Sequence, residues 1–128
     1  PKDARDALGD LPDVLRRLQE DAKLLRARHD ELADALGSAS DADASPEYEE
    51  IRALRDEAKL KQSQTIAALE TIRLGLLKMH AGATTVASLS THLGAAADVA
   101  ADVERLLEAR AEVDRALRFP REIATTPA

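Results

Sequence analysis

The sequence has no cysteine, no tryptophan and very few aromatic residues of any kind. Its 128 residues include a single Phe and a single Tyr, so aromatic residues make up 2% of the chain. Without cysteine, the chain cannot form a disulfide, use a thiol in catalysis or bind a metal through thiolates. A globular enzyme ordinarily buries more rings than this. A helix bundle does not need them, because Leu, Ile, Val and Ala fill the seams between its helices.

Positive charge and long apolar runs are also scarce. The chain has 18 Lys and Arg against 24 Asp and Glu, which gives a net charge of −6. No basic stripe is present to displace counterions from a nucleic-acid backbone, so we expect no nucleic-acid partner. No apolar run approaches the roughly 20 residues that span a bilayer, and no signal peptide is visible. We therefore expect no membrane insertion by this segment and a cytoplasmic location. The alternative is the soluble part of a longer membrane-associated chain.

Length and periodicity predict one folded domain. The chain begins at Pro1 rather than Met, so we expect it to be a piece of a longer protein. Hydrophobic residues make up 45% of it and recur in periodic order, which argues against disorder. We expect residues 1–120 to form a single helical bundle and residues 121–128 to form a flexible tail.

Apolar residues recur at alternating intervals of three and four, the spacing of helices that pack in a bundle or coiled coil. The spacing predicts helices at about 10–36, 46–81 and 85–117. The short segment Ala81–Ala83 is typical of a tight antiparallel connection between two helices. The predicted fold class is therefore all-α: an antiparallel three-helix bundle, or a long coiled-coil-like helical hairpin with a third helix packed along it.

Local signals mark the helix ends. Asp10 is the expected N-cap of the first helix and Gly37 its terminating residue. The second helix has the sharpest start, with Ser45 as N-cap and Pro46 in the first turn, where a missing N–H costs little. Thr84 or Thr85 caps the third helix.

The third helix is rich in small residues between Gly94 and Ala101. Small side chains let helix backbones approach each other, so we expect this segment to pack tightly on the second helix. A glycine inside a helix costs about 1 kcal/mol relative to alanine. Gly94 therefore suggests that close contact with the second helix is used at that position.

Residues Ile66–Met79 carry apolar side chains around more than one stripe, which is too wide for a single partner helix. We expect this segment to contact both other helices or another chain. With the helices in register, the first helix begins at Leu11, about level with Thr71, and leaves the apolar hairpin tip uncovered. In the alternative, Ala4 and Leu8 extend the first helix and cover the tip. The candidate interface residues are Leu74, Leu76, Leu77, Met79, Val86, Leu89 and Leu93.

No catalytic or cofactor-binding arrangement is recognisable. The histidines lack the Glu-x-x-His spacing of a di-metal bundle, and the glycines form no phosphate-binding loop. We therefore predict no enzymatic activity, no cofactor and no metal. His29 lies on the seam of the first helix, where it is either a ligand or pH sensor, or a seam residue with a backbone or carboxylate partner. The second reading is favoured, because no second ligand is spaced to join it.

One stretch resembles a known group of proteins. The segment 68–82, ALETIRLGLLKMHAG, continues into the helix at Val86–Leu117. Together they resemble helical hairpins that accompany bacterial serine/threonine-kinase-type signalling chains outside the catalytic domain. The resemblance covers the C-terminal half of the chain. It includes none of the kinase motifs, so no catalytic residue is carried over. It implies an accessory or regulatory helical region in a bacterial cytoplasm.

Three functions are compatible with the sequence. The favoured one is a non-catalytic helical protein–protein interaction or oligomerisation module that associates with itself or a partner through the hairpin tip. The second is a small-ligand sensor with a pocket in the bundle near Thr65 or His29. The third is a structural spacer between domains.

Overall fold

The computed structural model describes residues 9–37 and 45–118. Within these ranges the chain is all-α, without strands, and forms three helices: α2 (Leu11–Leu36), α3 (Pro46–His80) and α4 (Val86–Arg118). Each helix begins and ends within one residue of its predicted bounds, and all three pairs of helices are in contact. The predicted three-helix bundle is therefore confirmed. The expected tail and the lead-in with Ala4 and Leu8 lie outside the described residues.

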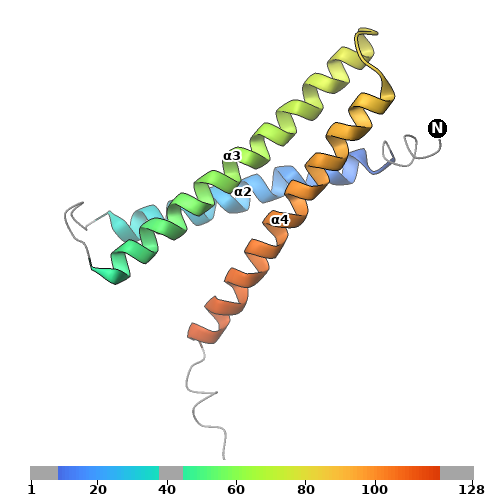
Figure 1. Ribbon diagram of the computed structural model, residues 1–128. Helices are drawn as coiled ribbons and strands as arrows, with labels where there is room; N and C mark the ends of the chain where they lie inside the picture. Colours follow the sequence, from blue (N-terminus) through green and yellow to red (C-terminus); the bar gives the residue numbers. More distant parts are fainter. Residues whose placement is uncertain (1–8, 38–44, 119–128) are drawn as a thin grey trace, which may run out of the picture.

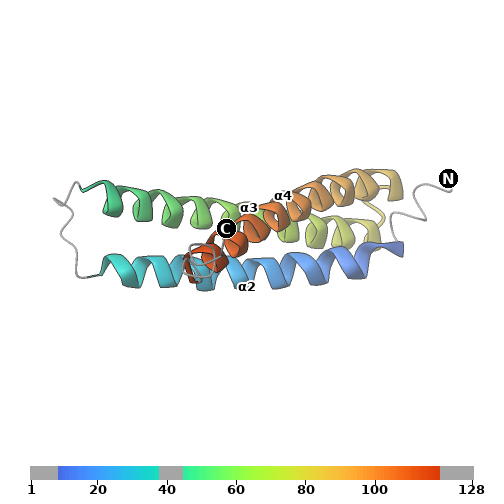
Figure 2. The ribbon, with the colours of Figure 1, turned by 90° about the horizontal axis from the view of Figure 1, so that it is seen from below.

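α2 and α3 lie side by side over much of their length, and α4 packs on both over its first half and diverges from them toward its end (Figure 1 and Figure 2). α3 and α4 form an antiparallel hairpin, and α2 crosses that hairpin at an angle (Figure 1). Seen from below, α2 and α3 run alongside each other, and α4 runs obliquely across them (Figure 2). The turn between α3 and α4 therefore stands clear of α2, and the last turns of α4 stand clear of the start of α3.

Side chains cap the starts of α3 and α4. Ser45 has an extended backbone, and its hydroxyl accepts a hydrogen bond from the backbone N–H of Tyr48 at 3.5 Å, with Pro46 in the first turn. The hydroxyl of Thr85 accepts from the backbone N–H of Ser88 at 3.1 Å. The predicted cap at Ser45 is confirmed, and Thr85 rather than Thr84 caps α4.

Asp10 and Gly37 flank α2 at the predicted positions, but the side chain of Asp10 does not cap the helix. The backbone of Asp10 is already helical, with φ −83° and ψ −7°, and its side chain makes no capping hydrogen bond. An N-cap side chain reaches the N–H groups of the first turn from an extended backbone, which Asp10 lacks. Gly37 also stays right-handed, at φ −59°. Among the described residues, positive φ occurs at Gly82, whose φ of 73° turns the chain between α3 and α4.

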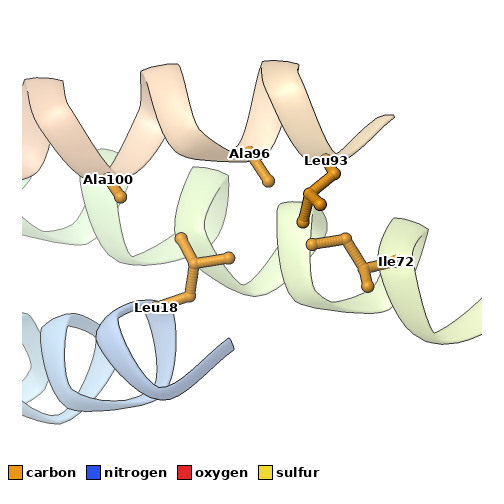
Figure 3. Packing of buried hydrophobic residues seen from close by; sticks show 5 residues of the cluster. All are labelled: Leu18, Ile72, Leu93, Ala96 and Ala100. Carbon is orange, nitrogen blue, oxygen red and sulfur yellow. The ribbon is translucent and has the colours of Figure 1, made fainter. Parts of the chain in front are cut away.

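The core lies where the three helices meet. Its central cluster consists of Leu18 from α2, Ile72 from α3, and Leu93, Ala96 and Ala100 from α4. Leu18 points toward the two alanines, and Ile72 lies beside Leu93 (Figure 3). The small alanine side chains let α2 approach the backbone of α4 at this point. As predicted from the wide apolar pattern of Ile66–Met79, α3 contributes to a core shared with both other helices.

The close helix contact predicted at Gly94 is wrong. Gly94 is exposed, and a Cβ atom added there would meet nothing within 4 Å. It lies two residues before the buried Ala96, which places it on the opposite side of α4. The close approach occurs instead at Gly75 of α3, where an added Cβ would lie 2.9 Å from Cδ1 of Leu89. Gly75 lies three residues after the buried Ile72, on the same face of α3.

Replacing Leu18 with alanine should lower the free energy of unfolding by about 2–5 kcal/mol, because the cavity left in the central cluster cannot fully collapse. Leu24→Ala on the same helix is the matched control. Its side chain is 55% exposed, so the change should stay within about 0.5 kcal/mol. Chemical denaturation of both variants measures the difference. Similar losses in the two would show that Leu18 is not part of the core.

The two helix-interior glycines should respond differently to alanine. Gly94→Ala should raise the free energy of unfolding of the monomer by about 0.5–1 kcal/mol, because it adds helix propensity without a clash. Gly75→Ala should fail to deliver that gain, since the fully buried Leu89 would have to move. Thermal unfolding at low protein concentration compares the two variants. Equal gains would contradict the close approach at Gly75.

Candidate interaction surface

The structure divides the seven candidate interface residues into three groups. Leu89 and Leu93 are 0% and 3% exposed, so they belong to the core and present no surface to a partner. Leu76 and Met79 are half-buried. Leu74, Leu77 and Val86 are exposed, by 47%, 55% and 38% of their surface. We call the last two groups together the tip surface: Leu74, Leu76, Leu77, Met79 and Val86.

The tip surface is uncovered because α2 packs on another part of the hairpin. The first apolar residues of α2, Leu11 and Leu15, pack against the central cluster. The turn at Gly82 stands apart from them, so the hairpin is only two helices thick there (Figure 1). This agrees with the register expected from the sequence. Whether Ala4 and Leu8 cover the tip stays a prediction, because both lie outside the described residues.

The surface around the tip is also free of charge over a long span. No Asp, Glu, Lys or Arg occurs from Met79 to Ala97, in a chain that is 33% charged. The exposed positions in this part of α4 are small or uncharged instead, for example Ala87, Thr91 and Ala95. A helix face that stays in water normally carries charged and polar side chains. The absence of charge distinguishes the turn and this part of α4 from the α3 side of the tip, where Lys78 is exposed between Leu77 and Met79.

A shallow hollow of about 220 Å³ lies between α3 and α4 beside the exposed Leu74. It exists because Gly75 has no side chain and Ser88 has a small one. Its lining consists of Thr71, Leu74, Gly75, Lys78, Thr84, Ser88, Leu89 and His92. The lining includes hydroxyls, one imidazole and one ammonium group, but no carboxylate. The hollow adds surface relief next to the apolar tip.

Ion pairs join α4 to the other helices. Lys61 Nζ lies 2.5 Å from Asp102 Oδ2, and Arg110 lies 2.9 Å from Oε1 of Glu57, both between α3 and α4. Arg17 of α2 reaches Oε2 of Glu104 at 2.6 Å. Partly exposed pairs of this kind contribute about 0–1 kcal/mol each, so they fix the alignment of the helices more than the stability of the bundle.

Two aspartates are perturbed in opposite directions. The hydrogen bond and the positive charge of Lys61 lower the pKa of the Asp102 carboxyl below its ordinary value. Desolvation raises the pKa of Asp21, and the nearby Glu104 and Glu20 add to the effect against the attraction of Arg17. Asp21 Oδ2 is buried and accepts no hydrogen bond from the described residues. The Asp21 carboxylate is therefore a partly desolvated charge, one of whose oxygens lacks a hydrogen-bond donor.

The two residues named for a ligand sensor have ordinary roles. Thr65 is fully buried, and its hydroxyl donates to the backbone carbonyl oxygen of Lys61 at 2.8 Å. His29 is 28% exposed, and its Nδ1 lies 3.2 Å from Oδ1 of Asp30. The favoured reading of His29, a seam residue with a carboxylate partner, is confirmed. Neither side chain lines the hollow at Gly75.

The described residues contain neither a metal-binding cluster nor a membrane span. Over 9–37 and 45–118, no three His, Asp or Glu side chains come together in a way that would hold a metal ion. In the same part of the chain, no helix combines the length and apolar character needed to cross a bilayer.

Removing the two perturbed carboxylates should change stability in opposite directions. The paired Asp102 stabilises the fold above the ordinary carboxyl pKa of 3.8, and this contribution is lost as pH falls through its lowered pKa. Asp102→Asn should therefore lower the melting temperature near pH 7. The charge on Asp21 destabilises the fold above its raised pKa, and the effect disappears below 3.8. Asp21→Asn should raise the melting temperature near pH 7. Melting curves across a pH series test both, and shifts of the same sign would contradict the assignment.

No protein-family model matches the chain, and neither the curated proteins nor the solved structures give a significant match.

Proposed function

We propose that this chain is a non-catalytic helical association module that binds a second copy of itself through the tip surface. The observation that supports this proposal is the exposure of Leu74, Leu77 and Val86 at the end of the hairpin that α2 leaves uncovered. Three large apolar side chains in water at one end of a small bundle carry a hydration cost. Burying apolar surface lowers the free energy by about 25 cal/mol per Å², so covering the tip favours association.

The charge distribution favours a second copy over an unrelated partner. In a two-fold dimer the same patch occurs on both sides of the interface, and residues near the axis meet their own copies. A charged residue there would face a like charge. The span from Met79 to Ala97 contains no Asp, Glu, Lys or Arg, so the turn and the first part of α4 avoid that repulsion although each chain carries a net charge of −6. On α3, Lys78 is the nearest exposed charge to the tip leucines. Depletion of charge is also typical of the buried centre of protein interfaces.

Gly94 adds a second argument. It costs helix stability, yet no group of the described chain requires a glycine there, because an added Cβ would meet nothing within 4 Å. Close approach of another helix to this exposed side of α4 would account for it. A second two-helix layer on the tip would complete a four-helix arrangement, whose core takes residues from both chains.

The biological setting rests on the sequence resemblance alone. The likeness of segment 68–82 and the following helix to hairpins of bacterial kinase-type signalling chains favours an accessory or regulatory region of such a protein, in the cytoplasm. A self-associating module would bring two such chains together. A spacer between domains needs no association and predicts a monomer at every concentration, so the same experiment separates the two functions.

Molar mass measured by light scattering over a concentration series tests self-association. The wild-type mass should rise from that of the 13.8 kDa chain toward twice this value. Leu77→Glu should hold the protein at the monomer mass, because it places a like charge in each half of the interface. It should leave helicity intact, since a residue 55% exposed tolerates a polar side chain.

Leu60→Glu is the matched control. Leu60 is also 55% exposed and also lies on α3, but far from the hairpin turn. This variant should associate as the wild type does. A wild-type protein that stays monomeric at all concentrations would refute self-association. Equal loss in the two variants would show that association does not depend on the tip.

A further inference from the structure

A second open surface lies where α4 diverges from α2, away from the tip. Two neighbouring hollows of about 370 and 220 Å³ run along it and share three lining residues, Leu24, Leu107 and Ala111. We call this surface the α2–α4 groove. It is a consequence of the splayed arrangement, because α2 and α4 are close at the central cluster and separate beyond it (Figure 1).

The floor of the groove is apolar and its length suits a helix. Leu24 is 55% exposed, and Ala27 and Ala111 are also exposed. On α2, the groove residues recur at intervals of four and three: Arg17, Asp21, Leu24, Arg28 and Glu31. This is the spacing of a helix face that packs on another helix. From Arg17 to Glu31 the face is about 21 Å long at 1.5 Å per residue, enough for a partner helix of about four turns.

The rim of the groove is acidic. Five carboxylates line the two hollows, against three arginines, Arg17, Arg28 and Arg110; the carboxylates belong to Glu20, Asp21, Glu31, Glu104 and Glu108. Arg17 is paired within the groove, with Glu104, and Arg110 is paired outside it, with Glu57 of α3. The surplus of negative charge around an apolar floor is complementary to an apolar stripe flanked by Lys or Arg.

Asp21 indicates where such a cation would bind. Its Oδ2 is buried at the wall of the groove and accepts no hydrogen bond from the described residues. A buried acceptor without a donor lowers the stability of the fold, and an interaction with a charged donor compensates for this loss better than one with a neutral donor. A lysine or arginine that enters the groove from another chain would place the opposite charge beside this carboxylate.

We infer that the α2–α4 groove binds an amphipathic helix of another protein. The apolar face of that helix covers Leu24 and Leu107, and one of its basic side chains binds the carboxylate of Asp21. The acidic rim excludes a second copy of this chain, which is itself acidic, from being the favoured occupant. The groove and the tip surface are separate, so this inference does not depend on self-association. Together they would give a module that pairs with itself at one end and holds a basic helix in its middle.

The test uses two synthetic 18-residue helical peptides with leucines at the seam spacing. One carries lysines beside the stripe, and the other carries glutamates at the same positions. Titration of the labelled protein, followed by NMR shifts and fluorescence anisotropy, should show saturable binding of the lysine peptide and none of the glutamate peptide. The shifts should concentrate at Ala27, Leu107 and Ala111, and affinity should fall as salt increases.

Matched substitutions separate groove binding from general attraction to an acidic protein. Leu24→Lys should weaken binding about tenfold or more, whereas Leu60→Lys, at the same 55% exposure and with the same charge change, should change it less than about twofold. Asp21→Asn should likewise weaken binding more than Glu50→Gln, which removes one exposed carboxylate on α3. Leu24, Leu60 and Glu50 are exposed, so their substitution should leave the fold intact. Circular dichroism verifies the fold of all four variants.

Three outcomes would overturn the inference. Equal effects of Leu24→Lys and Leu60→Lys would mean that the peptide senses only net charge. Binding of the glutamate peptide, or no saturable binding of either peptide, would exclude a basic helix as the occupant. Loss of self-association in Leu24→Lys, with Leu77→Glu still able to associate, would show that the groove holds a second copy instead.

Discussion

The packing of Leu18 between Ala96 and Ala100 is the contact on which the arrangement of the bundle depends. Alanine is the residue at which another helix can approach most closely without losing helix propensity. α2 therefore comes nearest to α4 at these two positions and crosses the hairpin at an angle. With 33 residues, α4 is much longer than such a crossing, so its last turns diverge from α2 (Figure 1). Both open surfaces follow from this one crossing.

The two open surfaces differ in charge, and that difference indicates different partners. The tip presents exposed leucines beside a span without charged residues on α4, so two copies can meet there with little like-charge repulsion. The α2–α4 groove has an apolar floor with an acidic rim and a carboxylate oxygen that lacks a donor. A basic helix compensates that rim, and an acidic copy of the same chain does not. Electrostatic complementarity of this kind selects among partners more than it adds affinity.

The ion pairs hold the splayed geometry in place. Lys61–Asp102 and Arg110–Glu57 fix the alignment of α3 with α4, and Arg17–Glu104 fixes α4 against α2. Lys61 and Arg110 lie in stretches where the apolar spacing of the sequence is interrupted. A charged residue at a seam position is tolerated because its aliphatic part packs while its head reaches a carboxylate on the neighbouring helix. These interruptions therefore carry the pairs that prevent the helices from sliding.

The sequence alone determined the helices, because their apolar spacing and the Ser45–Pro46 start are local signals. It also placed Leu11 short of the hairpin tip, since helix length and turn position fix the register. It could not decide which glycine lies at a contact: Gly75 and Gly94 are equally isolated in the sequence. Only the rotation of α3 and α4 about their axes turns Gly75 toward the other helix and Gly94 away from it. Nor could the sequence reveal the α2–α4 groove, because its residues on α2 have the composition of a solvent-exposed helix face. The crossing angle decides that, and it is set by side chains far apart in the chain.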